Sequence, residues 1–180
     1  MTDQTCEQRV HDRWQSRRED LRLMLQPTWR DVELVDAGTL DTTIRIGEVE
    51  QTFDAESAAE WRDEDTGAFD PDPIQLQDIL DGFEEDLYER FNEYALAFDF
   101  VEPDTFDDQP RGYFRYQISY GGPSSEIRFY CDHGQPTPDR IEYWFLDWFD
   151  GAHLDVTADA VALAVWERFS DFADDIREAA

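Results

Sequence analysis

The stretch GYFRYQISYGGPSSEIRFYCDHGQPTPDRIEYWFLDWF, residues 112–149, decides the fold class of this chain. Within it, residues 112–120, 125–131 and 140–149 are rich in aromatic and β-branched side chains, and the first two segments alternate apolar with other residues. A GGPS turn separates the first two segments, and a loop containing Gly and Pro precedes the third. The stretch therefore predicts three consecutive strands of an antiparallel meander.

The third strand continues into IEYWFLDWFDGAHLDV, which packs five aromatic residues into its first nine. Such a run suits a ligand pocket or the centre of a core. It lies in the densest apolar part of the chain, and a sheet covered by helices needs aromatic side chains of this kind. We interpret it as a core strand, with Ile141, Tyr143 and Phe145 on one face and Trp144 and Leu146 on the other.

Helices and shorter strands are expected around this meander. Helices are predicted at residues 4–25, 74–98 and 157–178, the last capped by Thr157 or Asp155. Short strands are predicted at 31–35 and 42–53. A loop with one helical turn is predicted at 54–73 and an acidic connection at 99–111. The exit of the third meander strand is predicted at Asp147, Asp150 and Gly151. The chain is thus predicted to form a single acidic α+β domain over residues 1–180, an antiparallel sheet of three or more strands packed with about three helices.

The helix predicted at 74–98 has the clearest pattern of the three. Its apolar residues, from Leu76 to Phe98, recur at intervals of three and four residues. Asp72 is a suitable N-cap, with Pro73 at the first helical position. The opposite face carries a set of acidic residues, which are Asp78, Asp81, Glu85, Asp86, Glu89 and Glu93.

The charge of the chain is extreme and unevenly distributed. Its 44 acidic residues face 15 basic ones, all of them Arg, for a net charge of -29. Residues 1–30 carry +1, residues 31–110 carry -23 and residues 111–180 carry -7. Such acidity argues against nucleic-acid binding through a basic footprint and against docking on anionic membranes. Two interpretations stay open: an acidic surface for a basic partner, which the uneven distribution favours, or adaptation to high salt, which the lack of Lys and the 27 Asp against 17 Glu favour.

Motifs for catalysis, metals or cofactors are not found in the sequence. The pair of Cys131 and His133 is interpreted as a strand thiol and a loop histidine, and the two cysteines as reduced thiols of a cytoplasmic protein. The acidic run at Asp63, Glu64 and Asp65 lacks the spacing of an EF-hand loop. Neither a secretory signal nor an apolar run of about 20 residues is recognised. We therefore expect a protein without enzymatic activity, metal or cofactor.

The acidic helix face is the remaining candidate site. Side chains four residues apart on a helix lie about 5–6 Å from each other, so these carboxylates form a row of negative charge. Duplex DNA presents rows of phosphates, and a basic cleft built for them can accept a row of carboxylates instead. The alternative is a solvated helix face. The predicted partner is a basic nucleic-acid-binding protein or nuclease complex, contacted by Asp63, Glu64, Asp65, Asp78, Asp81, Glu85, Asp86, Glu89 and Glu93.

Two resemblances bear on this expectation. The stretches YQISYGGPSSEIRFY and IEYWFLDWFDGAHLDV are similar to small acidic proteins encoded on plasmids and phages, over residues 112–156. In charge and size the chain also resembles the DNA-mimic anti-restriction and anti-CRISPR proteins. The resemblance implies a protein that inhibits a host defence complex by occupying its DNA-binding cleft. It transfers no functional residue to this chain.

Overall fold

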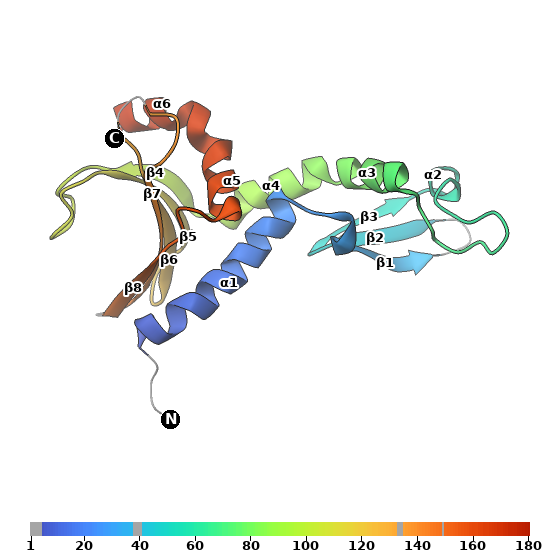
Figure 1. Ribbon diagram of the computed structural model, residues 1–180, viewed down its shortest axis with the longest axis horizontal. Helices are drawn as coiled ribbons and strands as arrows, with labels where there is room; N and C mark the ends of the chain where they lie inside the picture. The colour runs from blue at the N-terminus through green and yellow to red at the C-terminus, as the bar shows by residue number, and fades with distance from the viewer. Residues whose placement is uncertain (1–4, 38–40, 133–134, 149) are drawn as a thin grey trace. The chain divides into compact units, whose positions relative to one another are not determined.

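The computed structural model describes residues 5–37, 41–132, 135–148 and 150–180. The chain divides into two compact units: unit 1 comprises Met1–Leu21 and Asn92–Ala180, and unit 2 comprises Arg22–Phe91. Each unit combines helices with an antiparallel sheet, which confirms the predicted α+β class (Figure 1). The two boundaries fall inside helices α1 (Cys6–Leu25) and α4 (Glu84–Tyr94). The predicted single domain over residues 1–180 stays a prediction.

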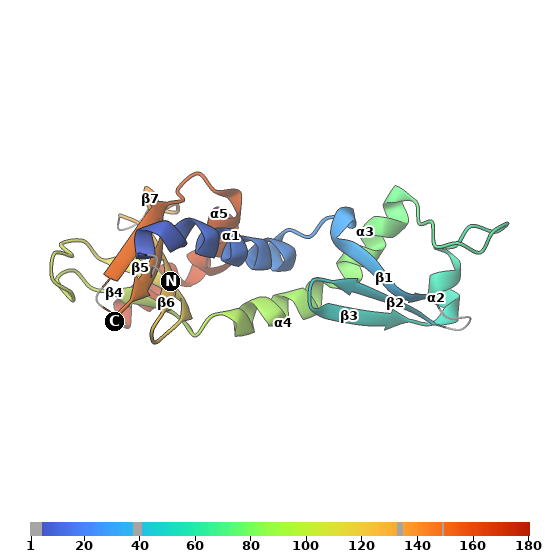
Figure 2. The ribbon, with the colours of Figure 1, turned by 90° about the horizontal axis from the view of Figure 1, so that it is seen from below.

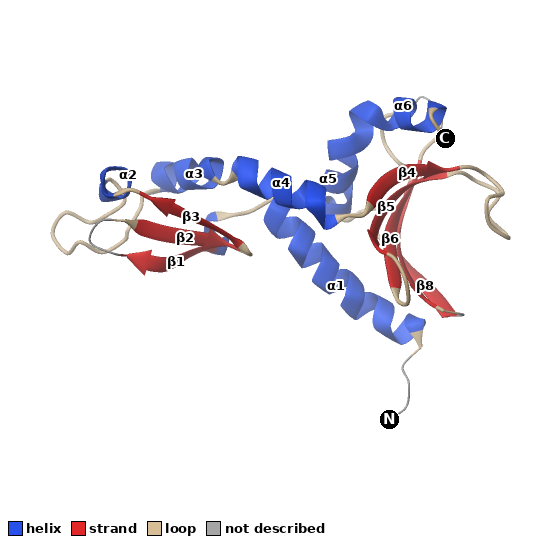
Figure 3. Ribbon diagram, turned by 180° about the vertical axis from the view of Figure 1, so that it is seen from behind, coloured by secondary structure: helices blue, strands red, loops and turns tan. Residues whose placement is uncertain are grey.

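Unit 1 is built on a five-stranded sheet in which every strand is antiparallel to its neighbours (Figure 3). The strands follow chain order and are β4 (Ala97–Val101), β5 (Tyr113–Ser119), β6 (Ser124–Tyr130), β7 (Arg140–Asp147) and β8 (Asp150–Asp155). The predicted meander is confirmed as β5, β6 and β7. Its register aligns Tyr116 with Ile127 and Ile127 with Tyr143, so the three strands present matching faces.

Two strands of this sheet were not predicted. Residues 97–101, expected as the end of a helix and the start of a connection, form β4, where Phe98 pairs with Tyr116 and Asp99 with Arg115. The expected strand exit at Asp150 and Gly151 is instead the start of β8. Its sequence DGAHLD has turn residues and little β-propensity, so pairing with β7, and not local preference, makes it a strand.

The core of unit 1 lies on one face of this sheet. Trp166 of α5 (Ala160–Phe169) packs with ring centroids 5.3 Å from Phe114 and 5.4 Å from Phe129. On the same face, Trp14 of α1 lies 5.1 Å from Tyr143. Ile141, Tyr143 and Phe145 are at most 2% exposed, which confirms the interpretation of this strand as part of the core.

The last predicted helix is interrupted in the structure. It begins one turn later than expected, because the Asp159 carboxylate accepts the backbone N–H of Val161 at 2.8 Å and caps α5. Thr157 does not cap the helix, because its hydroxyl donates to the Asp155 carboxylate at 2.6 Å. A 3-10 turn, η2 (Ser170–Phe172), then separates α5 from α6 (Ala173–Glu178).

Unit 2 is a three-stranded meander with helices on one side. Its elements are η1 (Trp29–Asp31), β1 (Val32–Ala37), β2 (Thr42–Ile46), β3 (Val49–Phe53), α2 (Ala55–Ala59), α3 (Pro73–Gly82) and the greater part of α4. The strand predicted at 42–53 is a hairpin that turns at Gly47, whose φ of 59° favours glycine. Ile44 and Ile46 of the sheet pack with Ile79 and Phe83, so α3 covers one sheet face (Figures 1 and 2).

The helix predicted at 74–98 is two helices and ends early. The Asp72 cap is confirmed, because its carboxylate accepts the N–H of Ile74 at 2.8 Å and of Gln75 at 2.9 Å. The helix then breaks at Phe83, which follows a glycine and is fully buried in the unit 2 core. α4 restarts at Glu84 and stops at Tyr94. The acidic residues expected on one continuous helix therefore divide between α3 and α4.

An ion pair anchors the start of unit 2. Arg22 at the end of α1 donates to both carboxylate oxygens of Asp31, at 2.7 and 2.9 Å, and the backbone N–H of Thr28 donates to the same group at 2.7 Å. The Arg22 guanidinium and the Thr28 donors lower the pKa of Asp31 to about 2. This carboxylate therefore stays ionised at any pH near neutral and fixes the chain between α1 and β1.

Candidate functional site

All nine acidic residues predicted to bind a partner are exposed. Three lie in the loop between α2 and α3, two on α3 and four on α4. Eight of them belong to unit 2, whereas Glu93 lies beyond the boundary and belongs to unit 1. The structure thus keeps eight of the nine within one unit, on a loop and two successive helices.

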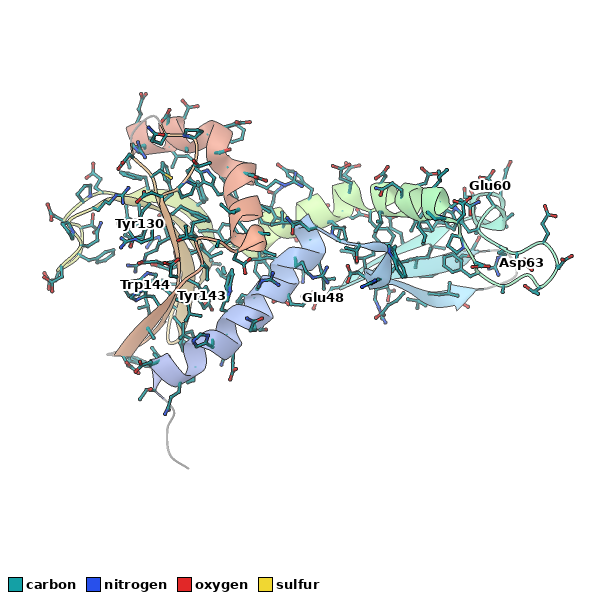
Figure 4. All side chains as sticks on the ribbon, in the orientation of Figure 1. Glu48, Glu60, Asp63, Tyr130, Tyr143 and Trp144 are labelled. Carbon is teal, nitrogen blue, oxygen red and sulfur yellow. The ribbon has the colours of Figure 1, made fainter. Side chains whose placement is uncertain are left out.

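The loop residues differ in what their carboxylates do. Asp63 accepts the backbone N–H of Thr66 at 2.7 Å, the Thr66 hydroxyl at 2.7 Å and the N–H of Asp65 at 3.2 Å. These donors, led by Thr66, lower the pKa of Asp63, so this carboxylate is ionised and builds the turn (Figure 4). Glu64 and Asp65 are exposed beside it. Within the described part of the chain, no group of three or more His, Cys, Asp or Glu side chains is arranged to hold a metal ion.

The helices of unit 2 leave their carboxylates exposed, outside the apolar core. Ile79, Leu87 and Phe91 are at most 3% exposed and fix the inward faces of α3 and α4. The outward positions form what we call the acidic surface, which consists of Asp78, Asp81, Glu85, Asp86 and Glu89. Glu84, which is not among the predicted partner-binding residues, is exposed at the start of α4 next to this set.

Two neutral side chains support members of the acidic surface. Gln77 donates its amide to Asp81 at 2.8 Å, and Gln51 of β3 donates to Asp86 at 2.5 Å. These bonds orient two carboxylates without removing their charge. Glu85 and Glu89 stand four residues apart on α4, where side chains are neighbours at about 5–6 Å.

The arginines of unit 2 do not neutralise this surface. The unit holds 20 acidic and 5 basic residues, a net charge of -15 in 70 residues, against -14 in the 110 residues of unit 1. Arg22 pairs with Asp31, Arg45 with Glu33 and Glu50, and Arg90 of α4 with Glu48 of the β2–β3 turn. Among the residues that the structure describes, no arginine forms an ion pair with the acidic surface, which is therefore an uncompensated negative field.

A second feature lies on the other face of the unit 1 sheet, opposite the core. Figure 4 shows Tyr143 and Trp144 on opposite sides of that sheet. Trp144 is sandwiched there between the Arg128 guanidinium, 4.0 Å from its ring centroid, and the ring of His153, 4.5 Å away. We call this side the open face. Two clefts of about 480 and 610 Å³ lie on it and share Phe106 and Arg128.

The open face contains two buried carboxylates. The Glu126 side chain is 4% exposed and accepts Arg128 Nε at 2.6 Å. Glu142 is 8% exposed and accepts the Tyr130 hydroxyl at 3.1 Å and Trp144 Nε1 at 2.9 Å. Both are satisfied by hydrogen bonds, as buried charges must be. This network was not predicted, because Glu126 and Glu142 stand next to apolar residues in their strands, a pattern that assigns the carboxylates to solvent.

Neither cysteine is prepared for nucleophilic chemistry. Burial raises the pKa of Cys131 to about 12, so its thiol is protonated at neutral pH. Burial and a hydrogen bond to Asp150 also raise the pKa of Cys6. His133, interpreted from the sequence as a loop histidine, lies outside the described residues.

The chain matches no protein-family model, no curated protein and no solved structure at a significant level. Within the described residues, no helix is both long and apolar enough to cross a membrane.

Proposed function

We propose that this protein is a non-enzymatic inhibitor that mimics DNA, acting in the cytoplasm on a basic nucleic-acid-binding complex such as a restriction or RNA-guided nuclease. The observation that carries the proposal is the acidic surface of α3 and α4, exposed and without arginine partners among the described residues. Clustered like charge destabilises a fold by self-repulsion. A basic partner that neutralises the cluster offsets that cost.

The charge density of this surface supports the comparison with DNA. Glu84, Glu85, Asp86 and Glu89 fall within six residues of α4, a length of about 9 Å at a rise of 1.5 Å per residue. That is about one charge per 2.3 Å, close to the ~1.7 Å per charge along duplex DNA. Glu85 and Glu89 share one face of α4, so a cleft lined with Lys and Arg for phosphates would meet these two charges about 5–6 Å apart.

The proposal is tested by competition with DNA. Purified restriction and RNA-guided nuclease complexes are incubated with labelled duplex DNA and increasing amounts of the protein, and DNA occupancy is followed by mobility shift. We expect at least one of these complexes to lose its DNA, with inhibition that more DNA reverses and that weakens as salt rises. Inhibition that excess DNA does not reverse would contradict mimicry, and so would the absence of inhibition of any complex in both classes.

Adaptation to high salt is the second candidate, and the composition favours it through the absence of Lys and the excess of Asp over Glu. It predicts that the protein folds only where salt screens the repulsion among its acids. For a mimic we expect one cooperative thermal transition in low-salt buffer, with a modest rise in Tm in multimolar KCl. If circular dichroism shows a folded protein only in multimolar KCl, the acidity is an adaptation and the proposed mimicry loses its support.

A further inference from the structure

We propose that the smaller cleft on the open face of the unit 1 sheet binds a nucleoside monophosphate, with the base on Trp148 and the phosphate on Arg115 and Arg128. The cleft measures about 480 Å³, within the size range of small-ligand sites. Its charged lining residues are Arg115, Arg128 and Glu126, and Arg115 is also paired with Asp99, so these four charges cancel in a chain of -29. This inference is independent of the acidic surface of unit 2.

Trp148 is the first observation that points to a ligand. Its side chain is 85% exposed, so it contributes little to the core. Its backbone has a φ of 53°, in the left-handed region that bulky residues rarely adopt and that Gly or Asn would occupy without strain. A large aromatic residue with a strained backbone and an exposed side chain does not stabilise the fold. A planar ligand that covers the indole would explain its presence.

The indole also contacts the neighbouring turn. A Cβ added to Gly122 would lie 2.7 Å from Trp148 Nε1, so the ring packs directly against the glycine backbone of the β5–β6 turn. Tyr120, 82% exposed on that turn, lines the same cleft. An aromatic surface fixed before binding loses little conformational freedom when a base stacks on it.

The two arginines supply the anion-binding part. Asp99 accepts Arg115 Nε at 2.9 Å and Nη2 at 2.6 Å, and Glu126 accepts Arg128 Nε at 2.6 Å. Each guanidinium has five N–H donors, so both retain donors for a ligand while their orientation is fixed. A ligand with a phosphate dianion can contact both guanidinium groups of the cleft, and it suits them better than a ligand with a single carboxylate.

The neighbouring larger cleft is a weaker candidate. Its indole, Trp144, already has Arg128 on one side and His153 on the other, so no free ring face remains for a base. Its lining also carries acidic residues, including Asp107, Asp108 and Glu142, beside its arginines. An exposed indole and two arginines occur together only in the smaller cleft of the two.

The test is isothermal titration of the whole chain with AMP and GMP in about 150 mM KCl, where the Debye length is about 8 Å. We expect saturable one-to-one binding of at least one of them, with tryptophan fluorescence quenched in parallel. Trp148→Ala and Arg115→Gln should each weaken binding about tenfold or more, whereas Trp148→Phe, which keeps an aromatic ring, should retain most of it. Trp29→Ala, at an exposed residue of unit 2, and Arg45→Gln, at a half-buried one, are the matched controls and should bind normally.

The same titration distinguishes the parts of the ligand. Adenosine and inorganic phosphate should each bind more weakly than AMP, because each uses half of the site. Inorganic phosphate binding as tightly as AMP would overturn the stacking role of Trp148. Full AMP binding by a folded Trp148→Ala variant, or no binding of AMP and GMP to the wild-type chain, would overturn the site.

Discussion

Replacing Asp78, Asp81, Glu85 and Glu89 with the corresponding amides is expected to weaken binding of the inhibited complex about 100-fold and to leave the fold intact. Exposed charge pairs contribute about 0.2–1 kcal/mol each, so four at about 0.7 kcal/mol correspond to two orders of magnitude in Kd. None of the four side chains is buried, and among the described residues none is paired with an arginine. Their loss therefore removes repulsion without breaking an ion pair, and Tm should stay level or rise.

The matched control for this variant replaces four exposed acids of unit 1, Asp171, Asp174, Asp175 and Glu178, with amides. It changes the net charge by the same amount, so it separates a specific surface from a general effect of acidity. Glu93 is left unchanged because it lies outside unit 2. Affinity is measured by titration at fixed ionic strength. If both variants bind equally well, or both lose affinity equally, then the acidic surface is not the contact.

The sequence was sufficient for those parts of the fold where local preference and tertiary packing agree. In β5, alternation of Phe114, Tyr116 and Ile118 with polar residues gave both the strand and its buried face. Asp72 and Pro73 likewise fixed the start of α3. The break at Phe83 was not recognised, because its spacing from Ile79 and Leu87 fits a continuous helix. Its ring packs into the unit 2 core, a tertiary contact that the spacing alone does not reveal.

Of the two candidate sites, one could likewise be predicted from the sequence and the other could not. The exposure of Glu85 and Glu89 followed from the apolar spacing of α4, so the acidic surface could be predicted residue by residue. The cleft around Trp148 could not, because it depends on the contact of that indole with Gly122, 26 residues earlier in the chain. Arg128 and Glu126 alternate with apolar residues and so resemble any solvated strand face. Their burial results from pairing with each other and with the neighbouring strands.

Phe83→Ala is expected to lower the free energy of unfolding by about 3–5 kcal/mol, the usual cost of removing a buried phenyl ring. The Phe83 side chain is fully buried among Ile44, Ile46, Ile79 and Leu87. Its truncation leaves a cavity that the surrounding strands and helices fill only in part. Urea unfolding measures the loss, and Phe172→Ala, at a 59% exposed residue of unit 1, is the control, with an expected change within about 0.5 kcal/mol.

The same variant tests the prediction of a single domain, because the two units can be followed separately. The boundaries between them fall within α1 and α4, so unfolding one unit would unwind part of a helix that belongs to both. If the chain is a single cooperative domain, Phe83→Ala accelerates hydrogen exchange in both sheets by the same factor. Exchange in β5, β6 and β7 is then compared with exchange in β2 and β3. Exchange that accelerates only in β2 and β3 would show two domains that unfold independently. The acidic surface would then lie on a domain that can unfold while unit 1 remains folded.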